Sequence, residues 1–127
     1  MQVETRQAAI YCRVATASDF ALEKQRLSLH SFAESRGFDV TAEYLDNGEK
    51  GLTFDRPAFS KLDNDMHEGK IQALIVLDIS RIGRESLVVS KWLDKAKELG
   101  VEVILEHGDI QDFELFYSLF HQIIKLK

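Results

Sequence analysis

Apolar runs of strand length alternate with segments of helical periodicity along this chain, and the alternation restricts its fold more than any other feature. Apolar runs that predict strands occur at residues 8–14, 38–44, 71–77 and 101–105, and helical patterns occur at 20–36, 57–68 and 85–99. Strands that alternate with helices are typical of a parallel sheet with helical crossovers. We therefore predict an α/β fold of three layers, α/β/α, with a mostly parallel sheet of four to five strands, the fifth being a short strand near Gly108.

Local signals support these boundaries. Gly37 and Gly100 each follow a helical pattern, where a glycine commonly ends a helix. Pro57 suits the first position of a helix, because its fixed φ fits there and its missing N–H is not needed. Within the helix at 20–36, a face of apolar residues is expected to point inward: Leu22, Leu27, Leu29, Phe32 and Ala33. The run at 71–77 is the most apolar and is predicted to be a central strand, and a loop is predicted over 45–56.

The composition fits a single domain over residues 1–127. The chain has 127 residues, of which 45% are hydrophobic, and this is enough for one buried core. Its formal net charge is −5, so it has no overall electrostatic attraction to DNA. If DNA is the target, we expect binding through a local cluster or through a missing or separate DNA-binding module.

Metal, cofactor and membrane signals are absent from the sequence. The single cysteine, Cys12, lies within the first strand pattern and is interpreted as a core residue. The four histidines show no short metal-ligand spacing, so we assign neither a metal nor a cofactor. No apolar run reaches the length of a membrane span, and the first residues do not resemble a signal peptide. We expect a cytoplasmic protein.

The last segment, at about 110–127, predicts a helix with apolar residues on most of its sides. A helix exposed to solvent does not tolerate that pattern. Two interpretations remain open, burial within the domain or contact with a second subunit. In either case we expect residues 113–124 to be largely buried.

Four short motifs occur in order and resemble those of one family. They are YCRVAT at 11–16, LEKQ at 22–25, DNG at 46–48 with Gly51 and FDRP at 54–57, and DISRIGR at 78–84. They resemble Tyr-x-Arg-Val-Ser-Thr, Ser-Leu-x-x-Gln, Asp-x-Gly-x-Ser-Gly with Asp-Arg-Pro, and Asp-x-Ser-Arg-x-Gly-Arg. These patterns belong to the N-terminal catalytic domain of serine recombinases of the resolvase and invertase type. The resemblance implies a resolvase-like fold and a dimerising helix that begins near residue 110.

Ala15 stands where this family has its nucleophile. By resemblance, the family's serine attacks a DNA phosphate, forms a serine-linked 5′-phosphodiester and releases a 3′-hydroxyl, without a metal, within a tetramer that exchanges and rejoins strands. An alanine methyl has no lone pair and no proton to lose, so it cannot form that bond. Thr16 and Ser18 are poor substitutes because the reaction requires precise placement. The alanine is either natural or introduced, and the sequence does not distinguish these origins.

The other candidate site residues are mainly arginines. Arg13, Arg56, Arg81 and Arg84 follow separate strands, and guanidinium groups pair well with phosphate oxygens. Because ligands bind at the carboxyl ends of parallel strands, we expect these residues to surround one anion pocket near Ala15. Gln25 is a candidate to bind phosphate or orient an arginine. Asp78 is a candidate to hold Arg81 or Arg84, or to cap a turn.

These observations predict a serine recombinase catalytic domain that acts on DNA and is inactive as written. We expect a homodimer or a higher homo-oligomer. The alternative is a non-catalytic interaction module that pairs with itself or with an active recombinase, although such a module would have no evident need for the arginines. A nucleotide-binding or receiver-like domain is disfavoured, because neither a glycine-rich phosphate loop nor an acidic cluster follows the first strand.

Overall fold

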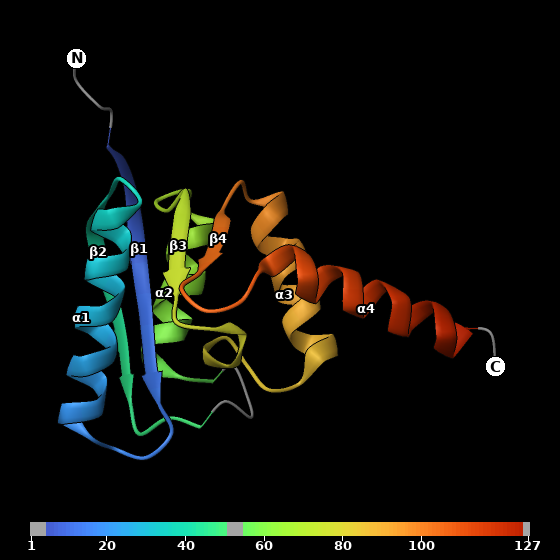
Figure 1. Ribbon diagram of the computed structural model, residues 1–127, viewed down its shortest axis with the longest axis horizontal. Helices are drawn as coiled ribbons and strands as arrows, with labels where there is room; N and C mark the ends of the chain where they lie inside the picture. Colours follow the sequence, from blue (N-terminus) through green and yellow to red (C-terminus); the bar gives the residue numbers. More distant parts are fainter. Residues whose placement is uncertain (1–4, 51–54, 126–127) are drawn as a thin grey trace.

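The computed structural model describes residues 5–50 and 55–125, in which strands and helices alternate as predicted (Figure 1). In chain order the elements are β1 Arg6–Val14, α1 Asp19–Ser35, β2 Phe38–Asn47, α2 Pro57–His67, β3 Ala73–Val76, the 3-10 helix η1 Ile79–Arg81, α3 Ser86–Glu98, β4 Glu102–Leu105 and α4 Ile110–Lys125.

The four strands form one sheet in the order β2-β1-β3-β4, and every neighbouring pair is parallel. The predicted central position of β3 is confirmed, and β1 is the other interior strand. Because the strands are parallel, all four carboxyl ends lie along one edge, where the arrowheads point in Figure 1. The motif at 78–84 follows the end of β3, and the motif at 11–16 extends just beyond the end of β1.

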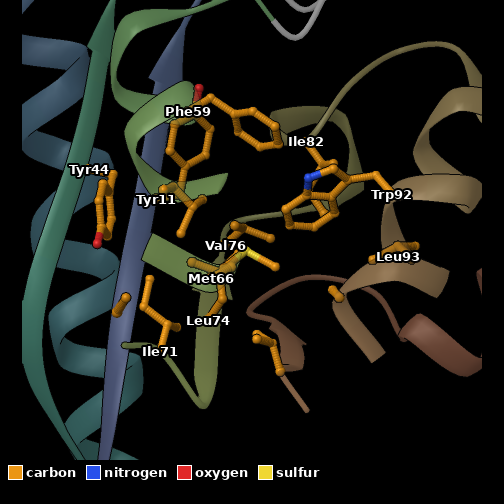
Figure 2. Close-up of a cluster of buried hydrophobic side chains, with 14 of the residues drawn as sticks. Tyr11, Tyr44, Phe59, Met66, Ile71, Leu74, Val76, Ile82, Trp92 and Leu93 are labelled. Atoms are coloured by element: carbon orange, nitrogen blue, oxygen red, sulfur yellow. The ribbon is translucent and has the colours of Figure 1, made fainter. Parts of the chain in front are cut away.

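Helices cover both faces of the sheet, which confirms the three-layer prediction. Alternate residues of β1 point to opposite faces, as the pleat of a strand requires. Ile10 and Cys12 pack with Leu29 of α1 on one face. Tyr11 packs on the other face with residues of α2 and α3, including Phe59 and Trp92 (Figure 2). The side chains of Tyr11 and Phe59 meet edge to face, with ring centroids 5.2 Å apart.

Two loops differ from the predictions. β2 continues three residues beyond the predicted end, because Leu45 to Asn47 pair with Cys12 to Val14 of β1. The predicted loop over 45–56 therefore starts at Gly48, and its residues 51–54, including the motif residues Gly51 and Phe54, lie outside the described residues. The sheet has four strands in the described part of the chain, and Gly108 lies in a bend with φ of 99° instead of a fifth strand.

The inward face of α1 differs from the predicted one at one position. Leu27 was expected to point inward, but this was wrong, since its side chain is 56% exposed. The buried residues of α1 are Gln25, Leu29 and Ala33, which follow one another at intervals of four. A polar residue therefore occupies the end of the buried face that lies nearest the carboxyl edge of the sheet.

The first turn of α4 packs on the domain, and the rest of the helix extends away from it (Figure 1). Ile110 and Phe113 are partly buried against the core on the face of α2 and α3. Beyond them Leu115, Phe116 and Leu119 are 61%, 65% and 52% exposed. At these three positions the domain alone therefore does not provide the predicted burial, and the side chains of Phe120, Ile123 and Ile124 lie outside the described part of the structure.

No helix in the described part of the chain combines the length and the apolar content needed to span a membrane.

Candidate active site

Arg13, Arg56 and Arg81 come together at the carboxyl edge of the sheet, and we call them the arginine cluster. Arg13 is 1% exposed and lies at the end of β1. Its guanidinium donates to three backbone carbonyls, from Nε to Arg81 (3.2 Å), from Nη1 to Glu49 (2.9 Å) and from Nη2 to Ser80 (2.5 Å). Arg13 thus ties β1 to the loops that follow β2 and β3.

Arg56 directly precedes α2 and is also 1% exposed. Its Nη1 donates to the Tyr11 hydroxyl (3.1 Å) and to the Arg81 carbonyl (2.9 Å), and its Nη2 donates to the Ile82 carbonyl. Its guanidinium carbon lies 4.3 Å from the centre of the Phe59 ring, within range of a cation–π contact. The Arg81 carbonyl therefore accepts from both buried arginines.

Arg81 completes the arginine cluster from η1. Its Nη1 donates to the Arg13 carbonyl at 2.9 Å, so each of these two arginines binds the backbone of the other. Burial lowers the pKa of Arg13, and the positive charges of Arg56, Arg81 and Arg84 lower it further. The same positive charges favour an anion at this edge. Arg84 contributes to this field, but its side chain is exposed and it lies beyond the end of η1.

Gln25 holds the backbone of Arg13 instead of presenting its amide to the surface. Its Oε1 accepts from the Arg13 N–H at 3.0 Å, and its Nε2 donates to the Arg13 carbonyl at 3.1 Å. The side chain is 6% exposed. Of the two roles predicted for Gln25, the contacts correspond to the orientation of an arginine.

Asp78 combines the two structural roles expected of it. Its Oδ1 accepts from the Ser80 N–H at 3.0 Å and from the Ser80 hydroxyl, which caps η1. The same oxygen lies 3.8 Å from Arg81 Nε. Asp78 thus fixes the short helix whose carbonyls hold Arg13 and Arg56.

Tyr11 and Asp46 belong to this network, although the sequence analysis gave them no role. The Tyr11 hydroxyl donates to Asp46 Oδ2 at 2.7 Å and accepts from Arg56. Asp46 also accepts from the N–H groups of Ala58 (2.8 Å) and Phe59 (3.0 Å) in the first turn of α2. The available signals were a tyrosine within an apolar strand, whose hydroxyl needs a partner when buried, and an acidic residue at the end of β2.

Ala15 is partly exposed and directly follows β1, two residues after Arg13 of the arginine cluster. The Val14 carbonyl before it accepts from the N–H groups of Gly48 (2.9 Å) and Glu49 (3.1 Å). Ser18 caps α1, with its hydroxyl accepting from the Ala21 N–H at 3.1 Å. The hydroxyl of Ser18 therefore has a structural function.

The site predicted from the sequence is thus brought together in large part. Arg13, Gln25, Arg56, Asp78 and Arg81 form one network next to Ala15, and Arg84 lies outside it. Two arginines differ from the prediction in orientation. Arg13 and Arg56 were expected to face an anion pocket, but both are buried and donate to backbone carbonyls. Of the four arginines, Arg81, at 25% side-chain exposure, and the exposed Arg84 reach solvent.

Comparison with known families matches most of the chain. The family described as Resolvase, N terminal domain, matches residues 8–126. The chain belongs to this resolvase family. Its members include serine recombinase catalytic domains, so the family expected from the four motifs is confirmed.

Solved structures support the same assignment of this resolvase domain. The N-terminal catalytic domain of TP901-1 integrase is 25% identical, with a TM-score of 0.81 over 95% of this chain and 96% of that one. A resolvase family site-specific recombinase from Streptococcus pneumoniae shares the fold at 23% identity, with a TM-score of 0.73 over 96% and 92% of the two chains. A serine recombinase from Sulfolobus solfataricus also shares it, at 20% identity, with a TM-score of 0.68 over 96% and 83%. No curated protein gave a match.

Proposed function

We propose that this resolvase domain binds a DNA phosphate at the carboxyl edge of its sheet and that Ala15 prevents it from cutting the strand. The observation that carries this proposal is the convergence of the arginine cluster beside a residue without a hydroxyl. The family membership supports DNA as the substrate class.

The roles within the site differ among the arginines. Arg81 and Arg84 reach solvent and supply the guanidinium groups that meet the phosphate. Arg13 and Arg56 place positive charge beneath it and fix the loops, because their donors are bound to carbonyls. In the active form a serine at position 15 would attack phosphorus, expel the 3′-oxygen and leave a 5′-phosphoserine ester. Ala15 removes only the attacking atom.

The test restores that atom and avoids the need for a known target sequence. Ala15→Ser is incubated with thymidine 5′-(p-nitrophenyl phosphate), whose nitrophenolate replaces the 3′-oxygen as the leaving group. The serine oxygen forms a bond to phosphorus, the P–O bond to nitrophenol breaks, and the serine proton passes to solvent. We expect the mass of Ala15→Ser to increase by one thymidylyl group, and the mass of the original chain to stay unchanged.

Ala17→Ser is the matched control, because it places the same hydroxyl two residues further along the same loop. It should acquire no adduct. An adduct on the original chain, or equal labelling of the Ala17→Ser protein, would refute the assignment of position 15. Arg81→Gln combined with Ala15→Ser should label more slowly, since it removes a guanidinium that reaches solvent.

The alternative function is a non-catalytic module that pairs with itself or with an active recombinase. The exposed apolar residues of α4 favour it, namely Leu115, Phe116 and Leu119. The contacts of Arg13 and Arg56 also remove the argument against it, because both residues hold the loops together in a domain without catalysis. Adduct formation by Ala15→Ser separates the two, since an interaction module has no reason to keep a competent phosphate site.

A further inference from the structure

A groove of about 440 Å³ adjoins the arginine cluster at the carboxyl edge of the sheet. It lies between α1 and the ends of three strands, because Val14 ends β1, Leu77 follows β3 and His107 follows β4. Arg81 belongs both to its wall and to the arginine cluster. Its volume lies within the range of about 300 to 1,000 Å³ that is typical of sites for small organic groups.

The groove has apolar walls and one unusually exposed aromatic ring. Val14, Ala21 and Leu77 provide aliphatic surface, and Phe20 contributes its ring from the first turn of α1. Phe20 is 81% exposed, although most of the surface of a phenylalanine is normally removed from water. A flat apolar group stacked on this ring would cover it.

The charges in the groove are cationic. Lys24 and Arg81 line it, and the neighbouring carboxylates already have hydrogen-bond or ion-pair partners, although those of Glu106, Ser28 and His107, belong to the lining itself. Asp19 accepts from Asn47 Nδ2 at 2.9 Å, and Glu23 accepts from Arg26 at 2.9 Å. Glu106 accepts from the Ser28 hydroxyl at 2.6 Å, with the His107 imidazole 3.8 Å away. The groove therefore complements a ligand that has both a flat apolar part and a negative charge.

We propose that this groove binds an unstacked nucleotide of DNA, next to the DNA phosphate that the proposed function places at Ala15. The base stacks on Phe20, and its phosphate is held by Lys24 and Arg81. Aromatic side chains beside a cationic track are the usual means of holding unpaired bases. A nucleotide is favoured over an acidic peptide because Arg81 joins the groove to the proposed phosphate site. This inference rests on the proposed function, since it assigns a second contact to the same DNA.

The experiment titrates the ¹⁵N-labelled chain with two single-stranded tetranucleotides, and it needs no cleavage. One is tetrathymidylate, and the other has the same phosphates but only abasic sugars. We expect amide shifts at Ala21, Leu77 and Arg81 with both, and tighter binding of the strand that carries bases. Phe20→Ala should weaken binding of tetrathymidylate by about 5- to 150-fold and leave abasic binding unchanged. Lys24→Gln should weaken both.

Leu27→Ala is the matched control, because Leu27 is another exposed apolar residue of α1, at 56%, and does not line the groove. It should bind both strands as the original chain does. The proposal fails if Phe20→Ala binds tetrathymidylate as tightly as the original chain, if bases add nothing over the abasic strand, or if neither strand binds saturably. An acidic peptide that binds in a Phe20-dependent manner while tetrathymidylate does not would assign the groove to a protein partner.

This outcome is separable from that of the proposed function. If Ala15→Ser gives no adduct but binding still depends on Phe20 and on the bases, the groove is a nucleotide site and the catalytic proposal fails. If the adduct forms and Phe20→Ala changes nothing in the titration, position 15 is correctly assigned and the groove is not a base site.

Discussion

At the scale of single residues, the site shows charged groups used as structural ties. A buried guanidinium is costly unless its donors find partners, and in Arg13 the Nε, Nη1 and Nη2 atoms each donate to a backbone carbonyl. These carbonyls belong to the segments that follow β2 and β3. The positive charge next to Ala15 is thus coupled to the order of the loops, and loss of either would disturb the other.

Gln25 provides the first test of this coupling. We expect Gln25→Ala to lower the free energy of unfolding by about 1–3 kcal/mol, because it leaves the buried Arg13 N–H without its acceptor. Urea denaturation followed by circular dichroism measures this change. Lys24→Ala, the exposed neighbour on the same helix, should change stability by less than about 0.5 kcal/mol. Equal losses in the two variants would show that the Gln25 contacts contribute little.

Tyr11 gives the domain a sensitivity to alkaline pH. Burial raises the pKa of Tyr11, and its hydrogen bond to Asp46 raises it further. Burial and a hydrogen bond to Asp65 also raise the pKa of Tyr44. Above the ordinary tyrosine pKa of about 10, the unfolded chain loses these protons while the folded chain keeps them. The stabilisation is therefore complete below about pH 10 and is lost as the pH rises further, by up to about 1.4 kcal/mol per pH unit for each tyrosine.

Unfolding by urea at a series of pH values from about 8 to 11 measures this decline. Tyr11→Phe should flatten it, because phenylalanine has no proton to lose, although the variant will be less stable at neutral pH. Absorbance of tyrosinate at Tyr11 and Tyr44 should appear together with the loss of circular dichroism. The same pH slope in Tyr11→Phe and in the original chain would contradict the prediction.

At the scale of elements, β2 sets the position of α2 through one side chain. Arg56, the residue before α2, makes no capping hydrogen bond with its own side chain. Asp46 at the end of β2 accepts instead from Ala58 and Phe59 in the first turn of α2. A carboxylate at a helix N-terminus also interacts favourably with the helix dipole.

Asp46→Ala should therefore destabilise the domain by about 1–3 kcal/mol, since it removes the cap of α2 and leaves the Tyr11 hydroxyl without its acceptor. Asp55→Ala, an exposed acidic residue just before α2, is the control and should have little effect. A double-mutant cycle with Tyr11→Phe should show a coupling of about 0.5–3 kcal/mol, because the two side chains share a hydrogen bond. Simple additivity would indicate that Asp46 acts on α2 alone.

The order and type of the main elements could be predicted from the sequence. The burial and the hydrogen-bond partners of their polar residues could not. Periodicity and glycine signals predicted the four strands and the four α-helices, but they missed η1 and added a fifth strand near Gly108 that the described residues do not form. The inward position of Gln25 and the exposure of Leu27 depend on the carbonyls and side chains that tertiary structure brings near, and these leave no local pattern. Tyr11 and Asp46 were missed for the same reason. Tyr11 binds Arg56, which is 45 residues away in the chain, and Asp46 binds Ala58 and Phe59, which are 12 and 13 residues away.

At the scale of the whole molecule, α4 is the helix that extends away from the body of the domain (Figure 1). Its first turn is fixed by Ile110 and Phe113, and the helix then leaves the body (Figure 1). Fully burying a large apolar side chain contributes about 1.5–3 kcal/mol, and three such side chains on α4 are more than half exposed. Because these side chains remain largely exposed in the single chain, the exposed face favours a second copy of the chain as the partner.

We therefore expect the chain to self-associate through α4. Sedimentation over a concentration series should show an average mass that rises from that of the monomer towards that of a dimer. Phe116→Asp should keep the chain monomeric over the same range, because a charge on this face would have to be buried without a partner. Leu27→Asp places the same charge at an equally apolar, exposed position on α1 and should still associate. A monomer at high micromolar concentration, or equal behaviour of the two variants, would rule out α4 as the contact, and protection of its amides from hydrogen exchange only at high concentration would locate the interface there.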